Sequence, residues 1–280
     1  MLLPRRAVLA GLAAVAAGGA RAVAPISPLT IEPESRIMQG GWLRGRVPHQ
    51  STALKLDGKP IPFASDRTFL LAFDRDAGPL ARIELTLESG QSSVSEIAIA
   101  PRAWQIEHIN VARKPGGVTD EDYLRLRRAE LVRIAAARAV DTGAQGWRQG
   151  FIRPAPGRFS GRFGSQRIYK GEQAAYHSGL DIAGGAGTTY VAPAEGIVTL
   201  AAQSPFSLEG RLLMLDHGMG LNSAFLHASE LLVREGDKVA QGTPLGRIGA
   251  TGRATGPHLH WSMKWQASRI DPLLFLPEPA

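Results

Sequence analysis

Short apolar runs separated by glycine-containing turns constrain the fold of this chain more than any other feature of its sequence. Glycine accounts for 32 of the 280 residues, about 11% against an average usage of about 7%. Many of the runs alternate between apolar and polar residues, which is the pattern of half-buried β-strands. The sequence therefore predicts a mainly β protein with many tight turns rather than a helical bundle.

The chain contains no cysteine. This excludes a disulfide scaffold, a cysteine-ligated zinc ribbon, a thiol nucleophile and a lipid-modified N-terminal cysteine. Hydrophobic residues make up 44% of the chain and charged residues 20%, so it can bury a core. Any metal site must be built from histidine and carboxylate side chains, and the chain has seven histidines.

Residues 1–22 have the pattern of a signal peptide. A basic start with Arg5 and Arg6 precedes an uncharged apolar run, and Ala20-Arg21-Ala22 fits an A-x-A cleavage site. We expect cleavage near Ala22 and export by either the Sec or the twin-arginine route. Cleavage would remove three arginines and no acid, so the net charge of +7 would fall to +4, which gives little support to nucleic-acid binding. No later run is long enough to anchor the mature chain in a membrane.

Residues 29–105 are predicted to form an immunoglobulin-like β-sandwich, because short alternating runs recur between turn signals. The runs lie at 42–47, 53–56, 68–73, 82–87 and 95–99. Residues 29–105 contain one histidine, His49, which we interpret as a surface residue. The sequence leaves open whether this domain recognises another molecule, shields a site elsewhere in the chain, or acts as a spacer.

Residues 106–153 are predicted to be a linker with one helix at about 119–140. The helix begins at a capping-box-like Thr119-Asp120-Glu121-Asp122 and ends before Gly143. Leu124, Leu131 and Ala135 share one face, and arginines dominate much of the rest. The arginine side is either a solvated face or a surface for an anionic partner. Glycines at 116–117 and between 143 and 150 predict flexible joints at both ends of the helix.

Residues 154–278 contain five of the seven histidines. In Pro257-His258-Leu259-His260-Trp261 no helical period is present, so a strand is expected, with His258 and His260 on the same face. His177 and Asp181 offer an imidazole and a carboxylate that could complete a ligand set with one member of this pair. Two histidines and one aspartate suit Zn²⁺ with a fourth position left for water. No H-E-x-x-H occurs, so the helical metalloprotease arrangement is excluded. His217 is interpreted as structural.

Three motifs in this order resemble the M23 family of zinc metallopeptidases, the lysostaphin- or LytM-type peptidoglycan endopeptidases. They are His177-Ser178-Gly179-Leu180-Asp181, Phe225-Leu226-His227 and the run from Gly252 to His260. The resemblance implies an antiparallel β metallopeptidase domain with one Zn²⁺ ion held by His177, Asp181 and His260. It also implies that His227 and His258 are catalytic: His258 as the base and His227 as the oxyanion stabiliser, or the reverse. The implied reaction is hydrolysis of a peptide bond of peptidoglycan, with zinc-bound water as the nucleophile.

The sequence departs from the family pattern at two positions. Phe225 stands where a tyrosine is common, and Ala175 stands where an arginine is common; both put substrate preference and rate in doubt. The alternative function is a catalytically weak or inactive relative that binds and activates cell-wall amidases. A biotinyl-type carrier barrel is disfavoured because Met263-Lys264 follows the histidine pair rather than occupying a hairpin tip. The expected location is the periplasm or the extracellular space, with peptidoglycan as the partner, a divisome or amidase partner through the N-terminal domain as a further one, and no nucleic acid.

Overall fold

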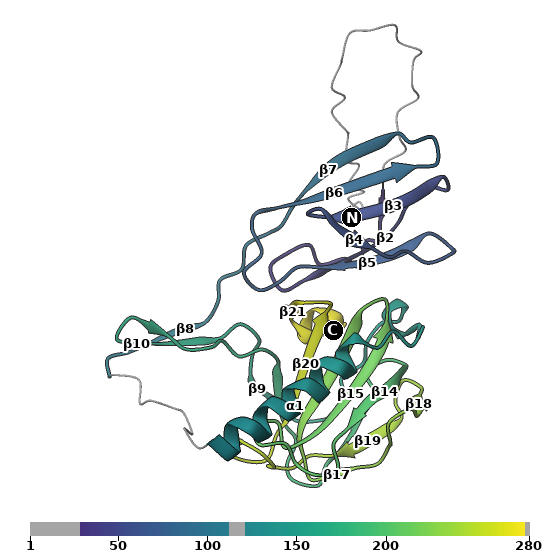
Figure 1. Cartoon of the computed structure of the whole chain (residues 1–280). Coiled ribbons are helices and arrows are strands. Elements are labelled where there is room, and N and C mark those ends of the chain that lie inside the picture. The colour runs from purple at the N-terminus through teal and green to yellow at the C-terminus, as the bar shows by residue number, and fades with distance from the viewer. Residues whose placement is uncertain (1–28, 112–120, 278–280) are drawn as a thin grey trace, which may run out of the picture. The chain divides into compact units, whose positions relative to one another are not determined.

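The computed structural model describes residues 29–111 and 121–277, and it confirms that the chain is mainly β (Figure 1). The predicted signal peptide, residues 1–22, lies outside the described residues. The chain divides into two compact units between Pro101 and Arg102. No helix in the described part of the chain is long and apolar enough to cross a membrane.

The first unit is built from two antiparallel sheets. One has the strand order β1-β2-β5 and the other β4-β3-β6-β7. The strands are β1 (Thr30–Ile31), β2 (Trp42–Arg46), β3 (Ser51–Leu56), β4 (Lys59–Ile61), β5 (Thr68–Ala72), β6 (Leu80–Leu87) and β7 (Ser92–Ala98). Ala81, Ile83 and Leu85 of β6 are buried at every second position, as one core-facing side of a strand requires. His49 is exposed. The immunoglobulin-like assignment stays a prediction.

An eight-stranded antiparallel sheet dominates the second unit, in the order β18-β14-β15-β16-β20-β12-β9, with β21 also paired to β20. Two three-stranded sheets, β13-β19-β17 and β11-β10-β8, complete it. The strands are β8 (Ile106–Ile109), β9 (Arg158–Gly161), β10 (Gln166–Tyr169), β11 (Glu172–Gln173), β12 (Leu180–Ala183), β13 (Thr189–Val191), β14 (Gly196–Ala201), β15 (Arg211–Gly218), β16 (Leu221–Ala228), β17 (Glu230–Leu231), β18 (Lys238–Val239), β19 (Pro244–Arg247), β20 (Leu259–Trp265) and β21 (Ser268–Ile270). The helices are α1 (Glu121–Ala139) and two 3-10 turns, η1 (Gly146–Arg148) and η2 (Pro272–Phe275).

His260 lies on strand β20, and His258 lies directly before the strand, in an isolated bridge with Gly249. Leu259, Trp261 and Met263 are fully buried on one face of the sheet. His260, Ser262 and Lys264 alternate with them and are only partly buried. This second face is therefore the one on which polar chemistry can occur.

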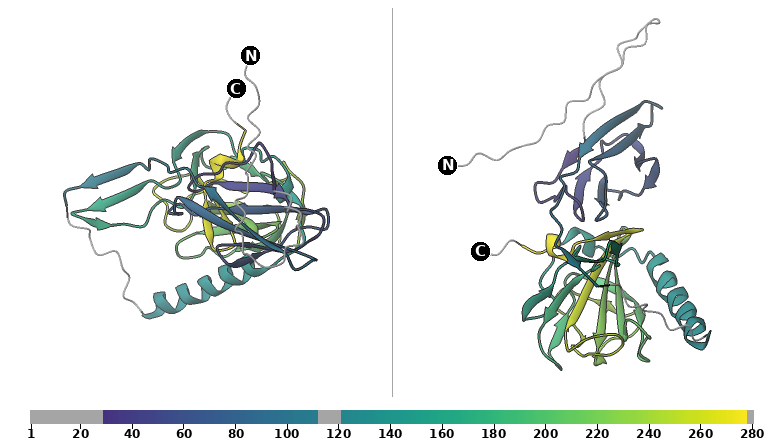
Figure 2. Two further views of the ribbon diagram at one scale, coloured as in Figure 1. Left: turned by 90° about the horizontal axis from the view of Figure 1, so that it is seen from above. Right: turned by 90° about the vertical axis from the view of Figure 1, so that its left-hand side faces the viewer.

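Helix α1 packs through a different face from the one that its apolar spacing indicates. Leu124, Leu131 and Ala135 are exposed, whereas Glu130 and Ala137 are buried. Ala137 joins a cluster from β14 to β16 against which Ile134 also packs; its other members are Leu200, Ala202, Phe206, Leu212, Met214 and Ala224. Figure 2 shows the helix running along one side of the sheet. The start predicted at residues 119–120 lies outside the described residues.

The predicted linker is integrated into the second unit. β8 pairs in parallel with β10, and α1 packs beside β14. The predicted flexible joint at 143–150 is wrong: Trp147 is 1% exposed, and a Cβ on Gly146 would lie 2.0 Å from the Glu195 carbonyl oxygen. Gly146 serves for close backbone approach rather than for mobility.

Candidate metal centre

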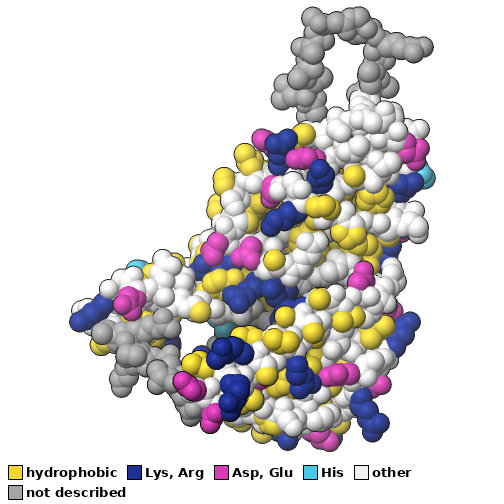
Figure 3. Space-filling model, viewed as in Figure 1, with side chains coloured by type: hydrophobic (Ala, Val, Ile, Leu, Met, Phe, Trp, Pro, Cys, Tyr) yellow, Lys and Arg dark blue, Asp and Glu magenta, His cyan; other side chains and the backbone are white. Residues whose placement is uncertain are grey.

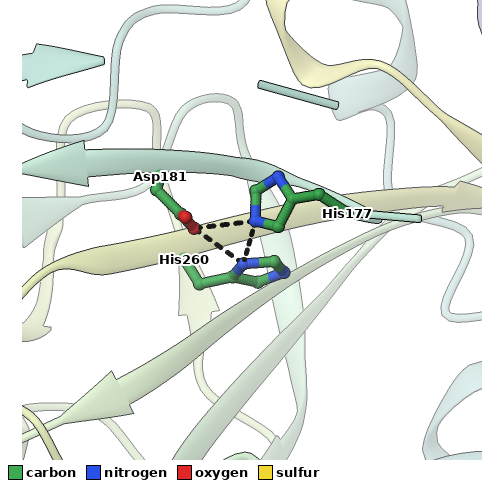
Figure 4. Close-up of side chains that lie close together, drawn as sticks. All are labelled: His177, Asp181 and His260. Atoms are coloured by element: carbon green, nitrogen blue, oxygen red, sulfur yellow. Dashed lines mark hydrogen bonds and ion pairs between the residues drawn. The ribbon is translucent and has the colours of Figure 1, made fainter. Parts of the chain in front are cut away.

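His177, Asp181 and His260 converge on one point of the polar face of the main sheet (Figure 4). Asp181 of β12 and His260 of β20 are direct cross-strand partners, which brings their side chains together on one face. His177 reaches them from the loop before β12. One ligand atom from each residue lies within 4.8 Å of the others.

The contacts between these atoms are short. His177 Nε2 lies 3.0 Å from Asp181 Oδ1 and 3.1 Å from His260 Nδ1. His260 Nδ1 lies 2.8 Å from the same carboxylate oxygen. A tetrahedral zinc ion with bonds of about 2.0–2.1 Å holds its ligand atoms roughly 3.3 Å apart. The observed spacing and the two-imidazole, one-carboxylate donor set therefore fit a single divalent ion.

Backbone carbonyls fix which nitrogen of His177 faces this point. Its Nδ1 lies 3.0 Å from the Arg162 carbonyl oxygen, which can only accept a hydrogen bond, so Nδ1 donates. In the neutral ring Nε2 is then left with a lone pair directed at Asp181 and His260. Such an outer hydrogen bond is the usual way in which proteins orient a metal-binding histidine. Sequence reasoning missed the Arg162 carbonyl as a partner, because a backbone group leaves no mark on residue type.

Burial and hydrogen bonding act in opposite directions on the three groups. Burial alone would raise the pKa of Asp181, but the hydrogen bonds that His177 and His260 donate when protonated, together with their charge, outweigh it and hold the pKa well below its usual range. Burial lowers the pKa of His260. For His177 burial opposes protonation, yet the hydrogen bond to Asp181 raises the pKa. The carboxylate is therefore ionised at neutral pH and available to a cation.

His258 and His227 lie beside this cluster. His258 Nε2 is 3.8 Å from Asp181 Oδ1, and its Nδ1 donates to the Gly256 carbonyl oxygen at 2.8 Å. The ring centre of His227 is 5.0 Å from that of His258 and 6.2 Å from that of His260. The structure thus brings together all five residues singled out in the sequence.

His227 is oriented by a backbone carbonyl in the same way. Its Nδ1 donates to the Thr251 carbonyl oxygen at 2.9 Å. Burial lowers the pKa of His227, so the neutral ring is favoured at pH 7. Because Nδ1 is committed to a carbonyl oxygen in both His227 and His258, Nε2 is the nitrogen that each ring directs at the site.

His217 lies apart from these residues and is fully buried, with 0% of its surface exposed. Its Nδ1 donates to the Glu195 carbonyl oxygen at 2.7 Å, and its Nε2 lies 2.8 Å from Ser223 Oγ. Trp261 Nε1 donates to the same hydroxyl oxygen at 3.1 Å. Every polar atom of the ring is satisfied, as the structural interpretation of His217 requires.

Asp271 caps η2 by accepting from the Leu273 N–H at 3.0 Å. It also forms an ion pair with Arg102 at 2.9 Å. Phe225, at the position of the first departure, is fully buried and stacks on Tyr190 with ring centres 5.5 Å apart.

Comparison with known proteins finds a family to which part of this unit is similar. Residues 175–272 match the model of Peptidase family M23. A crystal structure described as a putative peptidase M23 from Pseudomonas aeruginosa superimposes with a TM-score of 0.65 and 26% identity, covering 86% of this chain and 95% of that one. Residues 175–272 therefore form a segment that matches Peptidase family M23.

Curated relatives match over the same domain. Peptidoglycan DD-endopeptidase ShyA of Vibrio cholerae is 35% identical over 38% of this chain and 24% of its own length. The Lipoprotein NlpD/LppB homolog of Pseudomonas aeruginosa is 34% identical over 46% of this chain and 40% of its own. The chain thus spans between about a quarter and two fifths of the length of these two relatives.

Proposed function

We propose that this protein is an exported zinc metalloendopeptidase that hydrolyses peptide bonds of peptidoglycan. The observation that carries the proposal is the convergence of three metal-binding atoms beside two histidines whose Nε2 atoms are free to exchange protons. The match to ShyA, named a peptidoglycan DD-endopeptidase, supports peptidoglycan as the substrate and the periplasm or extracellular space as the location.

His177, Asp181 and His260 would hold the zinc ion. When bound, zinc acts as a Lewis acid that polarises a peptide carbonyl and lowers the pKa of water. Asp181 contributes the negative charge that favours a cation at this point. The Arg162 carbonyl oxygen fixes the ring orientation of His177 through a hydrogen bond from Nδ1.

We assign His258 as the general base, because its Nε2 lies 3.8 Å from Asp181 and is the nearer to the ligand set. With Nδ1 committed to Gly256, this ring accepts a proton at Nε2 and can pass it to the leaving amine. His227 belongs to β16, which pairs with β20 on the side opposite β12. It stabilises the developing oxyanion once its Nε2 is protonated. The reverse assignment differs only in which ring takes the first proton.

Digestion of purified sacculi tests this proposal. We expect the zinc-loaded mature chain to release fragments whose masses, measured by mass spectrometry, identify one cleaved peptide bond. Chelation should abolish release and added zinc should restore it. His258→Ala should keep its zinc and lose cleavage, whereas His49→Ala, at an exposed position, should cleave as the wild type does.

The alternative is a regulator that activates cell-wall amidases, and the similarity to the Lipoprotein NlpD/LppB homolog is the reason to test it. Zinc-loaded protein that releases nothing from sacculi, yet increases release by an added amidase, would favour the regulator over the peptidase.

A further inference from the structure

His227 points into the site only because strand β16 is irregular at this residue. Leu226 lies opposite His260, so in a regular strand the next side chain would point to the opposite face, with Phe225. Between the pairs Leu213–Phe225 and Arg211–Ala228 the register shifts, with two residues of β16 opposite one of β15. His227 also has φ +67°, a left-handed conformation that side chains other than glycine rarely adopt. This β-bulge turns the imidazole toward His258 and His260.

Two backbone segments hold the bulge. The N–H of His227 donates to the Glu209 carbonyl oxygen at 2.9 Å. On the other side Thr251 accepts from His227 Nδ1 at 2.9 Å and donates its hydroxyl to the Ala228 carbonyl oxygen at 2.8 Å. The position of Glu209 therefore bears directly on the position of His227.

Helix α1 fixes Glu209 through its side chain. Arg127 binds the Glu209 carboxylate with both terminal nitrogens, at 2.6 and 2.7 Å. Arg127 also binds Glu130 at 3.0 Å, and Glu130 accepts from both the N–H and the hydroxyl of Ser207 at 2.6 Å. The Arg127, Glu130 and Glu209 side chains are 17%, 4% and 13% exposed. Such a bidentate, largely buried pair is geometrically specific.

We propose that Arg127 and Glu209 are positioning residues for His227: the helix holds Glu209, and the Glu209 carbonyl holds the bulge that directs His227 at the substrate. This inference rests on the proposed function, since it takes His227 to act in the reaction. It assigns a part in that reaction to α1, which lies outside the segment 175–272 matched by the family model.

Another ion pair of the same helix provides a matched control. Arg133 binds Glu235 at 3.4 Å, with both side chains about half exposed. This pair also joins α1 to a later loop of the same unit, but no described contact links it to His227. We compare Arg127→Lys and Glu209→Gln with Arg133→Lys and Glu235→Gln. Lysine keeps the charge and loses the bidentate geometry.

Kinetics on a soluble cross-linked peptide form the first arm of the test. We expect Arg127→Lys and Glu209→Gln to lower kcat by roughly 10- to 100-fold, with KM and zinc content unchanged. The control variants should stay within about two-fold of the wild type. Rates of both pairs within two-fold of the wild type would overturn the proposal.

Imidazole NMR signals form the second arm and need no activity. In the zinc-loaded variants the His227 signals should shift while those of the buried His217 stay in place. A wild-type enzyme without activity would refute the proposed function, and the His227 signals would still decide the positioning. Unchanged His227 signals would overturn the proposal, because the network would then not position this ring. Shifts of both histidines, or failure of both variants to fold, would also overturn it, because the network would then serve the fold in general.

Discussion

The rings of His177 and His260 meet Asp181 through different nitrogens. His177 presents Nε2, because Nδ1 is committed to a carbonyl oxygen, whereas His260 presents Nδ1. The reversed ring of His260 needs space on its other side. Gly179, between the two proposed ligands His177 and Asp181, provides it: a Cβ there would lie 2.7 Å from His260 Nε2 and 2.6 Å from the Trp261 carbonyl oxygen.

Gly179→Ala should therefore weaken zinc binding by displacing His260. We expect an affinity loss of roughly 10- to 100-fold, the range found when groups that orient a ligand are altered. Competition titration with a chromophoric chelator measures it. Gly150→Ala is the control, since no atom lies within 4 Å of a Cβ at that position. Equal zinc affinity for the two variants would contradict the argument.

His217 makes stability depend on pH. Burial lowers the pKa of His217 to about 4, below an unfolded value of about 6.5. The unfolded chain then binds this proton at a higher pH than the folded chain does. The stabilisation is complete above pH 6.5 and is lost as the pH falls from about 6.5 to about 4, by about 3 kcal/mol in total.

Urea unfolding of the wild type and of His217→Gln at pH 7 and pH 4.5 tests this. The variant should be less stable at pH 7, since it loses part of the Glu195 and Ser223 contacts. Its free energy of unfolding should also fall less between the two pH values. Parallel losses in both proteins would contradict a neutral, buried His217.

At the scale of elements, α1 shows what determines a packing face. Its apolar spacing favours Leu124 and Leu131, but the buried side carries Glu130, whose partner Ser207 is 77 residues away. Figure 3 shows Lys and Arg side chains gathered over and beside this helix. Not all helical arginines belong to a solvated face, however, since Arg127 is paired internally.

A matched pair of truncations tests this packing. Ile134→Ala should cost about 2 kcal/mol, because Ile134 packs against the buried cluster. Leu131→Ala should change stability by less than about 0.5 kcal/mol, because Leu131 is exposed. Both changes introduce alanine into one helix, so helix propensity does not separate them. Urea midpoints in the reverse order would show that the other face is the packed one.

The sequence predicted those parts of the fold and site that depend on local period. The long strands and the shared face of His258 and His260 follow from alternation, and the motif resemblance selected all five site residues. The orientation of His227 does not follow from alternation, because a bulge reverses it. The packed side of α1 could not be predicted either, because it depends on distant contacts: Glu209, the partner of Arg127, lies 82 residues away. Contacts made by backbone carbonyls, such as that of Thr251, leave no signature in residue type.

At the scale of the whole molecule, the segment that matches the family model, residues 175–272, is smaller than the compact unit that contains it. The match begins at residue 175, yet β8 and α1 pack into the same unit, which begins at Arg102. A truncated chain that starts near Arg153 would lose both elements. The role of the N-terminal unit, as recognition module, shield or spacer, is therefore best tested with a cut at Arg102.

We expect residues 102–280 to fold alone and to bind zinc as the full mature chain does. Residues 153–280 should unfold at a lower temperature, because the cluster around Phe206 and Met214 loses Ala137 and Ile134. Calorimetry and zinc analysis of the two truncated chains measure both effects. Equal unfolding temperatures would contradict the inclusion of α1 in the unit.

The central claim is that His177, Asp181 and His260 bind one zinc ion between them. Elemental analysis of purified protein after dialysis tests it most directly. We predict one zinc per chain in the wild type and in His258→Ala and His227→Ala, and loss of zinc from His177→Ala, Asp181→Asn and His260→Ala. Full zinc content with full cleavage in Asp181→Asn and His260→Ala would contradict the claim.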